Sequence, residues 1–452
     1  MSKYAGPGGP TMAETKTPIG FIRNEGRRLM DRWWQEMTAA DGAGRPTAYV
    51  FVMGSLDEIL RVFDLPINCP EITSLQTAVR GRSLEYLQTA EGYGYSPDIC
   101  GYVKADVGLQ LKDRQHPNGT VPKPALAIAT NMCNTYIKWA EIWEQMYHCP
   151  VFVLDLPAWR GGDVTPRVDG EAFRNDRRYV EGQLRDLIGL CERLTGRRFD
   201  IDRLREVMAE VNRMAAGYQA VLSLNRHRPA PFSAIREGIV FQGISNLYRG
   251  TPEGSRFFEG AAEELRERIH LGMGTLNEKY RLLLTGTTCY AALKRFAELF
   301  EEWGGVFVHS TYMVFAGGGF ASDFAYDVTR PIESLAETLL LSAWRGFSTP
   351  MFYAQDWLAE TVREWSVDGI CFHGVKSCRT TSTGLPDVRE WLRTHFDIPG
   401  LFIQSDLVDP RMWSDAQLKN RIDAFIESLA GRRATGSHEA GIRRPSDANA
   451  AR

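Results

Sequence analysis

The residues of this 452-residue chain with the clearest capacity for chemistry are its eight cysteines. The N-terminal segment lacks the apolar core of a secretory signal, so we expect the thiols to stay reduced rather than to form disulfides. Reduced cysteines either pack as small apolar residues or bind a metal ion or an iron–sulfur cluster. No two of them have CxxC spacing, which argues against a zinc ribbon or an ordinary ferredoxin site.

Three cysteines stand out by their position relative to the predicted elements. Cys100 follows a Pro-Asp helix-start signal, Cys133 lies between a strand at 125–130 and a helix, and Cys378 follows a strand at 369–372. Ligands of an open parallel sheet bind beyond the carboxyl ends of its strands, and helix N-termini favour the thiolate form. We therefore expect the two thiols that follow strands to face one crevice, and Cys100 is compatible with the same crevice.

The other five cysteines fit this pattern less well. Cys191 lies on the apolar face of a predicted helix and is expected in the core, and Cys149 precedes its strand, at the opposite sheet edge. Cys371 lies inside a strand, where packing is the simpler role, although it could replace the third ligand. Cys289 starts a helix after a strand and is a competing ligand, whereas Cys69 lies in a Pro-flanked loop and stays ambiguous.

The elements that must position these residues alternate between short apolar runs and longer amphipathic ones, which predicts an α/β fold with parallel sheets. Strands are expected over 48–53, 125–130, 151–155, 281–286, 305–309, 369–372 and 400–404, and helices over about 134–147, 203–224 and 262–270. We expect two Rossmann-like parallel-sheet domains joined by a helical middle region. The predicted segments are a disordered tail at 1–18, an N-terminal α/β domain at 19–165, the helical middle region at 166–280, a C-terminal α/β domain at 281–430 and a second disordered tail at 431–452.

Composition excludes several classes of protein. The chain has 53 Lys and Arg against 56 Asp and Glu, a net charge of −3, which argues against a basic nucleic-acid binder. With 44% hydrophobic and 24% charged residues it is not a largely disordered chain. No stretch approaches the roughly 18 apolar residues of a membrane helix. We expect a cytoplasmic protein without nucleic-acid or membrane partners.

The segments around the three cysteines carry a resemblance to a known family. Residues 98–104 (DICGYVK), 129–135 (ATNMCNT) and 368–379 (DGICFHGVKSCR) resemble the three cysteine motifs of the 2-hydroxyacyl-CoA dehydratase / benzoyl-CoA reductase family. Residues 417–427 resemble its C-terminal helix. Within the family, residues 47–58 and 374–384 are most similar to the B-type subunits of ATP-dependent (class I) benzoyl-CoA reductases. The resemblance covers roughly residues 45–430.

The resemblance implies a cofactor and its ligands. Family members bind a [4Fe-4S] cluster through three cysteines, which here correspond to Cys100, Cys133 and Cys378. The cluster is expected in the cleft between the two α/β domains, with one iron free of protein ligands and open for chemistry. His373, between the strand and the third motif, is a candidate proton donor or shuttle, and a structural hydrogen bond is the alternative. His309, at another strand end, has the same two alternatives.

The resemblance also implies a function and partners. It predicts the catalytic subunit of an ATP-dependent benzoyl-CoA (aromatic acyl-CoA) reductase of anaerobic aromatic degradation, which reduces the ring by two electrons to a cyclic dienoyl-CoA. The implied partners are a smaller paralogous cluster-binding subunit and an ATP-hydrolysing, electron-activating subunit pair in a heterotetramer, with ferredoxin as the electron donor. The chain lacks a P-loop, which fits ATP binding by separate subunits.

Three other functions stay open. A radical 2-hydroxyacyl-CoA dehydratase subunit would use the same cluster but recycle its electron. A non-catalytic iron–sulfur scaffold or electron-relay subunit would close the cluster with a fourth ligand such as Cys289. A metal-free α/β binding protein would use none of these thiols as ligands.

Overall fold

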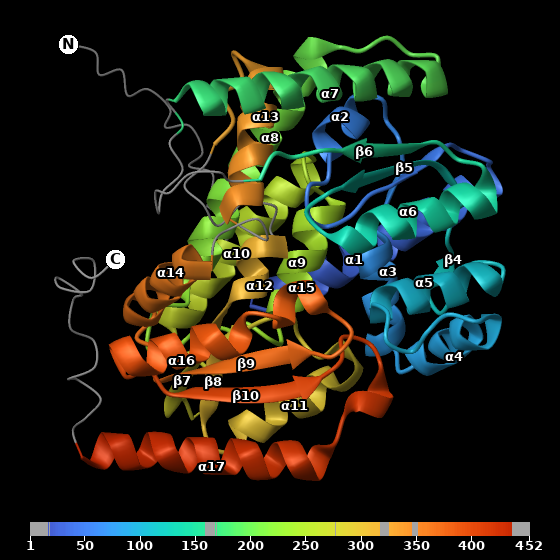
Figure 1. The fold of residues 1–452 in the computed structure, drawn as a ribbon. Coiled ribbons are helices and arrows are strands. Elements are labelled where there is room, and N and C mark those ends of the chain that lie inside the picture. The colour runs from blue at the N-terminus through green and yellow to red at the C-terminus, as the bar shows by residue number, and fades with distance from the viewer. Residues whose placement is uncertain are drawn as a thin grey trace, which may run out of the picture.

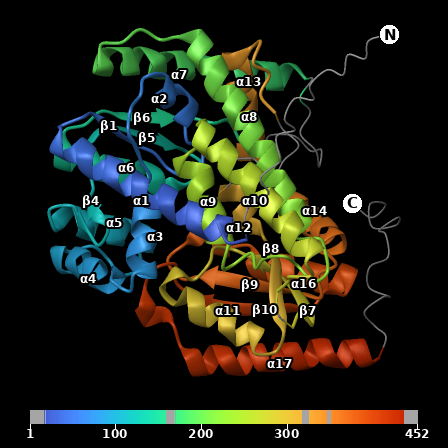
Figure 2. The same cartoon turned by 180° about the vertical axis from the view of Figure 1, so that it is seen from behind.

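The computed structural model describes residues 19–158, 170–275, 277–316, 325–345 and 351–435, together with Thr17 and Val168. Within these residues the chain forms two four-stranded parallel sheets and one short antiparallel hairpin, with helices packed around them (Figure 1). In both views the two sheets lie one above the other, and the long helix α1 (Phe21–Gly42) crosses the molecule against α9 and α10 (Figure 2). The prediction of an α/β fold with parallel sheets is confirmed.

The first sheet has the strand order β2-β1-β5-β6. The apolar run that was expected to form a strand over 48–53 pairs only at its start. Beyond that point the amide of Val50 still donates to the Asn68 carbonyl at 3.0 Å, but the amide of Val52 donates to a side chain, the Glu71 carboxylate, at 2.6 Å. The strands are β1 (Thr47–Tyr49), β2 (Ile67–Asn68), β5 (Pro124–Thr130) and β6 (Val151–Leu154).

The second sheet has the order β10-β9-β7-β8. Its central strand β9 is longer than the four residues predicted, because its register with β10 continues through Ser405 opposite Val375. Every residue of β9 is buried, as expected for a strand covered on both faces. The strands are β7 (Tyr280–Thr285), β8 (Gly305–Ser310), β9 (Gly369–Val375) and β10 (Gly400–Ser405).

Among the helices of the first half, α6 packs on β5 and β6 of the first sheet, whereas α4 packs on α5. The predicted helix at 134–147 has the bounds expected, whereas α1, α3 and α4 were not predicted, nor was the hairpin of β3 (Gln115–His116) and β4 (Gly119–Thr120). Besides α1, the helices are α2 (Asp57–Val62), α3 (Pro70–Val79), α4 (Ser83–Tyr93), α5 (Gly101–Leu111) and α6 (Asn134–Tyr147).

The described residues that follow β6 and precede β7 in the sequence form helices, as the sequence predicts. On α7 the buried side chains follow helical spacing, and they include Cys191, which is fully buried as expected. Helix α10 begins ten residues earlier than its apolar pattern suggested, at a Thr251 N-cap followed by Pro252. The helices are α7 (Glu171–Thr195), α8 (Ile201–Leu224), α9 (Gly238–Leu247) and α10 (Pro252–His270).

The remaining helices belong to the second half of the chain, where α11, α16 and α17 pack on the second sheet and α13 packs against α7. Helix α17 continues to Ala434, past residue 431, where the second loose tail was expected to begin; residues 1–16, 18 and 436–452 lie outside the described residues. No helix among the described ranges is both long and apolar enough to cross a bilayer. The elements are the 3₁₀ helices η1 (Tyr290–Ala292) and η2 (Pro410–Met412) and the helices α11 (Leu293–Glu301), α12 (Thr311–Ala316), α13 (Pro331–Arg345), α14 (Met351–Glu364), α15 (Arg379–Ser382), α16 (Leu385–Phe396) and α17 (Asp415–Ala434).

Candidate metal and acyl-CoA site

Three cysteines from distant parts of the chain line one cavity of about 60 Å³, which we call the thiol cavity. They are Cys100, Cys133 and Cys378, and each is the N-cap residue of a helix, of α5, α6 and α15 respectively. All three are partly exposed, whereas the other five cysteines are buried. The structure therefore brings together the three thiols that the sequence singled out.

Hydrogen bonds between neighbouring residues hold Cys100 close to Cys378. The amide of Gly101 donates to the Ser377 hydroxyl at 3.1 Å, and the amide of Ser377 donates to the Asp406 carboxylate at 3.2 Å. A Cβ atom on Gly101 would lie 2.7 Å from Asp406 Oδ1, too close for any other residue without a shift. The close approach of these two motifs therefore depends on glycine at position 101.

A buried carboxylate joins the two helices that begin with Cys100 and Cys133. Asp106 on α5 accepts hydrogen bonds at Oδ2 from the indole N–H groups of Trp139 and Trp143 on α6, at 2.7 and 2.8 Å. Its Oδ1 accepts from the Gln110 amide at 2.9 Å. Burial raises the pKa of Asp106 to about 6, although these hydrogen bonds oppose the increase. The carboxylate thus fixes α5 against α6 within the core.

The electrostatics of the thiol cavity favour a bound cationic group. Burial raises the pKa of the Cys100 thiol, and the nearby Cys378 and Cys133 raise it further. The pKa of Cys133 is raised by burial and by Cys378, while the backbone amide of Thr135 opposes this. No Lys or Arg is among the described residues that line the cavity. Three thiolates could be brought together there only with a group that supplies positive charge, such as iron.

The spacing of the donors bears on the kind of group. Among the described residues, no three His, Cys, Asp or Glu side chains lie close enough to hold a single metal ion. The donor set in the thiol cavity consists of thiols, the ligands typical of iron–sulfur clusters. By the chemistry of their donor atoms, the residues present therefore fit a group of this kind.

A carboxyl group that the sequence analysis missed lines the same cavity. Glu71 on α3 is buried, and its two oxygens accept hydrogen bonds from the Tyr136 hydroxyl and the Val52 amide, both at 2.6 Å. Burial raises its pKa to about 7, against the effect of these two donors. The available signal was Pro70 at the first position of a helix with an acid in its first turn. Glu71 can therefore exchange a proton near neutral pH.

The predicted proton donor His373 lies outside the residues that line the cavity. It is fully buried within β9, where its Nε2 is hydrogen-bonded to the Ser405 hydroxyl at 2.7 Å and its Nδ1 to the Thr287 carbonyl. Burial lowers its pKa. Both ring nitrogens are thus engaged by the protein, which favours the structural alternative. His309 is also buried, where it stacks on Trp365 at 4.4 Å.

The competing ligands are likewise absent from the described lining of the cavity. Cys289 is 1% exposed at the N-cap of η1, and Cys371 is fully buried within β9. Cys69, the N-cap of α3, is buried with its sulfur 4.0 Å from Glu71 Oε2. Cys149 is buried two residues before the start of β6. These positions fit packing roles for all but Cys69, which lies next to the cavity without lining it.

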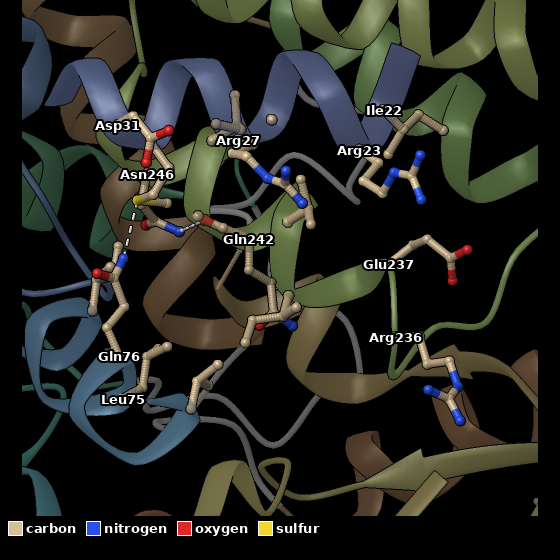
Figure 3. A pocket seen from close by; sticks show the side chains of 18 of the residues that line it. Ile22, Arg23, Arg27, Asp31, Leu75, Gln76, Arg236, Glu237, Gln242 and Asn246 are labelled. Carbon is tan, nitrogen blue, oxygen red and sulfur yellow. Dashed lines mark hydrogen bonds between the residues drawn. The ribbon is translucent and has the colours of Figure 1, made fainter. Parts of the chain in front are cut away.

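A much larger pocket of about 850 Å³ adjoins the thiol cavity, and the two share Val52 and Tyr312 in their linings. We call it the arginine pocket. Its inner wall is apolar, from side chains of α1, α3 and α9 such as Ile22, Leu75 and Val240. Figure 3 shows Arg23 and Arg27 on α1 and Arg236 on the segment before α9, and all three are among the residues that line the pocket.

The arginines of this pocket differ in their partners. Arg236 is paired with Glu301 and Arg268 with Glu264, each at 2.6 Å. Arg23, Arg27 and Arg80 are exposed, and they have no ion-pair partner in the described part of the chain. Unpaired guanidinium groups around an apolar pocket suit a ligand with an apolar body and phosphate groups at its end.

The chain is similar to known proteins over most of its length. The family model for the 2-hydroxyglutaryl-CoA dehydratase D-component matches residues 55–429. The chain is 30% identical over 416 residues to the B subunit of the benzoyl-CoA reductase of Thauera aromatica, covering 89% of this chain and 93% of that protein. It is 25% identical over 382 residues to the (R)-phenyllactyl-CoA dehydratase alpha subunit of Clostridium sporogenes. It is 24% identical over 384 residues to the (R)-2-hydroxyisocaproyl-CoA dehydratase alpha subunit of Clostridioides difficile. Each of these two matches covers 83% of this chain and 88% of the relative.

Proposed function

Because this chain belongs to the family of the 2-hydroxyglutaryl-CoA dehydratase D-component, we propose that it is the cluster-binding catalytic subunit of an ATP-dependent aromatic acyl-CoA reductase, with benzoyl-CoA as the type substrate. The observation that carries the proposal is the thiol cavity, in which three cysteines meet beside a pocket suited to an acyl-CoA. The more extensive similarity to a benzoyl-CoA reductase subunit than to the dehydratases supports the choice of reaction.

Cys100, Cys133 and Cys378 would hold the [4Fe-4S] cluster. When bound, the cluster would supply low-potential electrons. The protein's own contribution is to set the thiols at helix N-termini and to turn backbone amides toward the sulfurs, those of Tyr102 and Val103 toward Cys100. In this proposal the two sheets are the cores of two domains, at 19–165 and 281–430, with the cluster between them.

The arginine pocket would bind the CoA part of the substrate. The exposed guanidinium groups of Arg23, Arg27 and Arg80 would pair with its phosphates, and the apolar wall would cover the chain that leads to the thioester. The shared residues Val52 and Tyr312 then mark the point at which the acyl group enters the thiol cavity. The pocket's volume of about 850 Å³ is in the usual range for such ligands.

Reduction of the ring by two electrons also consumes two protons, and Glu71 would hold one of them. Its carboxyl lines the thiol cavity, and its pKa of about 7 leaves much of it protonated at neutral pH. The Tyr136 hydroxyl and the Val52 amide fix its orientation. His373, with both ring nitrogens engaged, has no part in this step.

The relatives are subunits of multi-subunit enzymes, which implies partner subunits here. We propose a smaller paralogous cluster-binding subunit and an ATP-hydrolysing subunit pair that receives electrons from ferredoxin, all in the cytoplasm. A second candidate, a 2-hydroxyacyl-CoA dehydratase subunit, is favoured by the names of several relatives. The two reactions differ in that the reductase consumes reductant and ATP in every turnover, whereas the dehydratase recycles its electron.

The test is anaerobic co-purification of the chain with the products of neighbouring genes, followed by incubation with benzoyl-CoA, ATP and reduced ferredoxin. We expect a cyclic dienoyl-CoA, formed with stoichiometric consumption of reductant and ATP. Dehydration of an (R)-2-hydroxyacyl-CoA with only catalytic amounts of ATP would favour the second candidate. A complex that binds no acyl-CoA would contradict both.

A further inference from the structure

Three tyrosine side chains from separate elements converge where the two cavities meet. Tyr102 lies on α5, two residues after Cys100, Tyr290 on η1 and Tyr312 on α12. The rings of Tyr102 and Tyr290 have centroids 6.5 Å apart, and all three phenol groups interact electrostatically with one another. Tyr102 and Tyr312 line the thiol cavity, and Tyr312 also lines the arginine pocket.

The Tyr102 hydroxyl is buried and makes no hydrogen bond of ordinary geometry among the residues that the structure describes, although the Tyr312 phenol is near enough to interact with it. The Tyr102 side chain as a whole is only 5% exposed. A buried hydroxyl that makes no hydrogen bond is costly, so an orphaned donor that lines a functional cavity points to a ligand atom that completes it. An oxygen acceptor is the natural partner, because a phenol is a good donor.

The place of these hydroxyls along the proposed path of the substrate identifies the ligand atom. An acyl-CoA with its CoA part in the arginine pocket and its acyl group near the cysteines must carry its thioester past Val52 and Tyr312, the two residues common to both linings, of which Tyr312 carries a polar side-chain group. The thioester carbonyl oxygen is the only strong hydrogen-bond acceptor in that part of a benzoyl-CoA molecule.

We propose that Tyr102 and Tyr312 donate hydrogen bonds to the thioester carbonyl oxygen of the bound acyl-CoA. This inference rests on the proposed function and adds the groups that stabilise the negative charge on the substrate during reduction. When the acyl group accepts an electron from the reduced cofactor, negative charge develops on the carbonyl oxygen, and two oriented O–H donors stabilise it there. No bond forms or breaks in this step, and neither tyrosine loses its proton.

A phenol with the ordinary tyrosine pKa of about 10 is a neutral O–H donor at neutral pH, which is the form that this role requires. No lysine or arginine among the described lining residues of the thiol cavity competes for the carbonyl oxygen.

The test uses the anaerobically purified complex and benzoyl-CoA labelled with ¹³C at the carbonyl carbon, without ATP or reductant, so that no turnover occurs. In infrared difference spectra we expect the carbonyl band of the bound thioester at lower frequency than in water. Tyr102→Phe and Tyr312→Phe should each move the band back toward the free position. With ATP and reductant, Tyr102→Phe should lower kcat roughly 100-fold with an unchanged iron content and little change in KM.

The matched control is Tyr86→Phe, which removes a buried hydroxyl on α4 that donates to the Gln115 carbonyl at 2.8 Å, away from both pockets. It should leave the band and kcat unchanged. A wild-type band at the free position, or one equally shifted in wild type and both variants, would overturn the inference while benzoyl-CoA binding upholds the proposed function. Absence of benzoyl-CoA binding to the wild-type complex would overturn both.

Discussion

Replacing Asp106 tests whether the helix pair behind the thiols is held as the structure indicates. This carboxylate is 1% exposed and accepts three hydrogen bonds, from the indoles of Trp139 and Trp143 and from the Gln110 amide. Helices α5 and α6 begin at Cys100 and Cys133, so whatever aligns the helices also aligns two of the thiols. We compare Asp106→Ala, which removes all acceptors, with Asp106→Asn, which keeps the shape.

The cost of the alanine variant follows from the groups that it leaves behind. Three buried N–H donors lose their acceptor, at about 2 kcal/mol each. Against this, the charged carboxylate of the wild type is itself destabilising. Burial raises the pKa of Asp106 from 3.8 to about 6, which corresponds to about 3 kcal/mol of unfolding free energy. We therefore expect Asp106→Ala to lose about 3 kcal/mol of unfolding free energy at pH 7.5, before any contribution from the cavity it creates.

The asparagine variant should behave differently because the network can adapt to it. Its amide oxygen can face the two indoles while its NH₂ group faces Gln110. The Gln110 side chain must then turn over, and it can do so because its other partner is the Tyr147 hydroxyl, at 2.7 Å, which can accept as well as donate.

Since the folded-state pKa of Asp106 is raised, the wild type loses stability as the pH rises from about 4 to about 6. Asp106→Asn should lack this loss and be at least as stable at pH 7.5.

The assay is urea unfolding together with iron content per chain, both under anaerobic conditions at pH 5 and pH 7.5. We expect Asp106→Ala to lose stability and most of its iron, and Asp106→Asn to keep both. Full iron and wild-type stability in the alanine variant would refute the role given to this carboxylate. An equal loss of stability and iron in both variants would contradict the expectation that asparagine can preserve the hydrogen bonds of this network.

Two further substitutions test other parts of the site. Glu71→Gln should lower kcat roughly 100-fold, because an amide cannot supply the proton. In the wild type, kcat should fall as the pH rises through about 7, where Glu71 loses its proton. If the same fall persists in the variant, Glu71 is not the donor. Gly101→Ala should cost about 1–3 kcal/mol of unfolding free energy, because its Cβ would lie 2.7 Å from Asp406 Oδ1 and 2.9 Å from Val408 Cγ2. The control Gly182→Ala, within α7 and with no atom within 4 Å of the added Cβ, should instead stabilise by about 0.5–1 kcal/mol, and similar values for the two would contradict the close packing at Gly101.

Much of the fold could be predicted from the sequence where local pattern and burial agree. The strands β5, β7 and β8 and the helix α6 are short apolar or amphipathic segments with clear ends, and they appear within one residue of the predicted bounds. The N-cap positions of Cys100 and Cys133 could be predicted as well, because each directly precedes a helical pattern.

What escaped prediction depends on contacts between distant segments. The cessation of strand pairing after Val50 reflects the bond from Val52 to Glu71, which no local pattern reveals. His373 looked like a residue beyond a strand end, but pairing with β10 extends β9 past it and encloses its ring. The arginine pocket draws its side chains from α1, α3 and the segment before α9, so its existence could be seen only in the folded chain.

The central claim is that Cys100, Cys133 and Cys378 together hold an iron–sulfur cluster in the thiol cavity. The most direct measurement is iron and acid-labile sulfide per chain in the anaerobically purified complex, for each of the three Cys→Ser variants beside Cys191→Ser, whose thiol is fully buried on α7. We predict that each of the three loses most of its iron and sulfide while Cys191→Ser retains the wild-type content. Full iron and sulfide in all three variants would contradict the account.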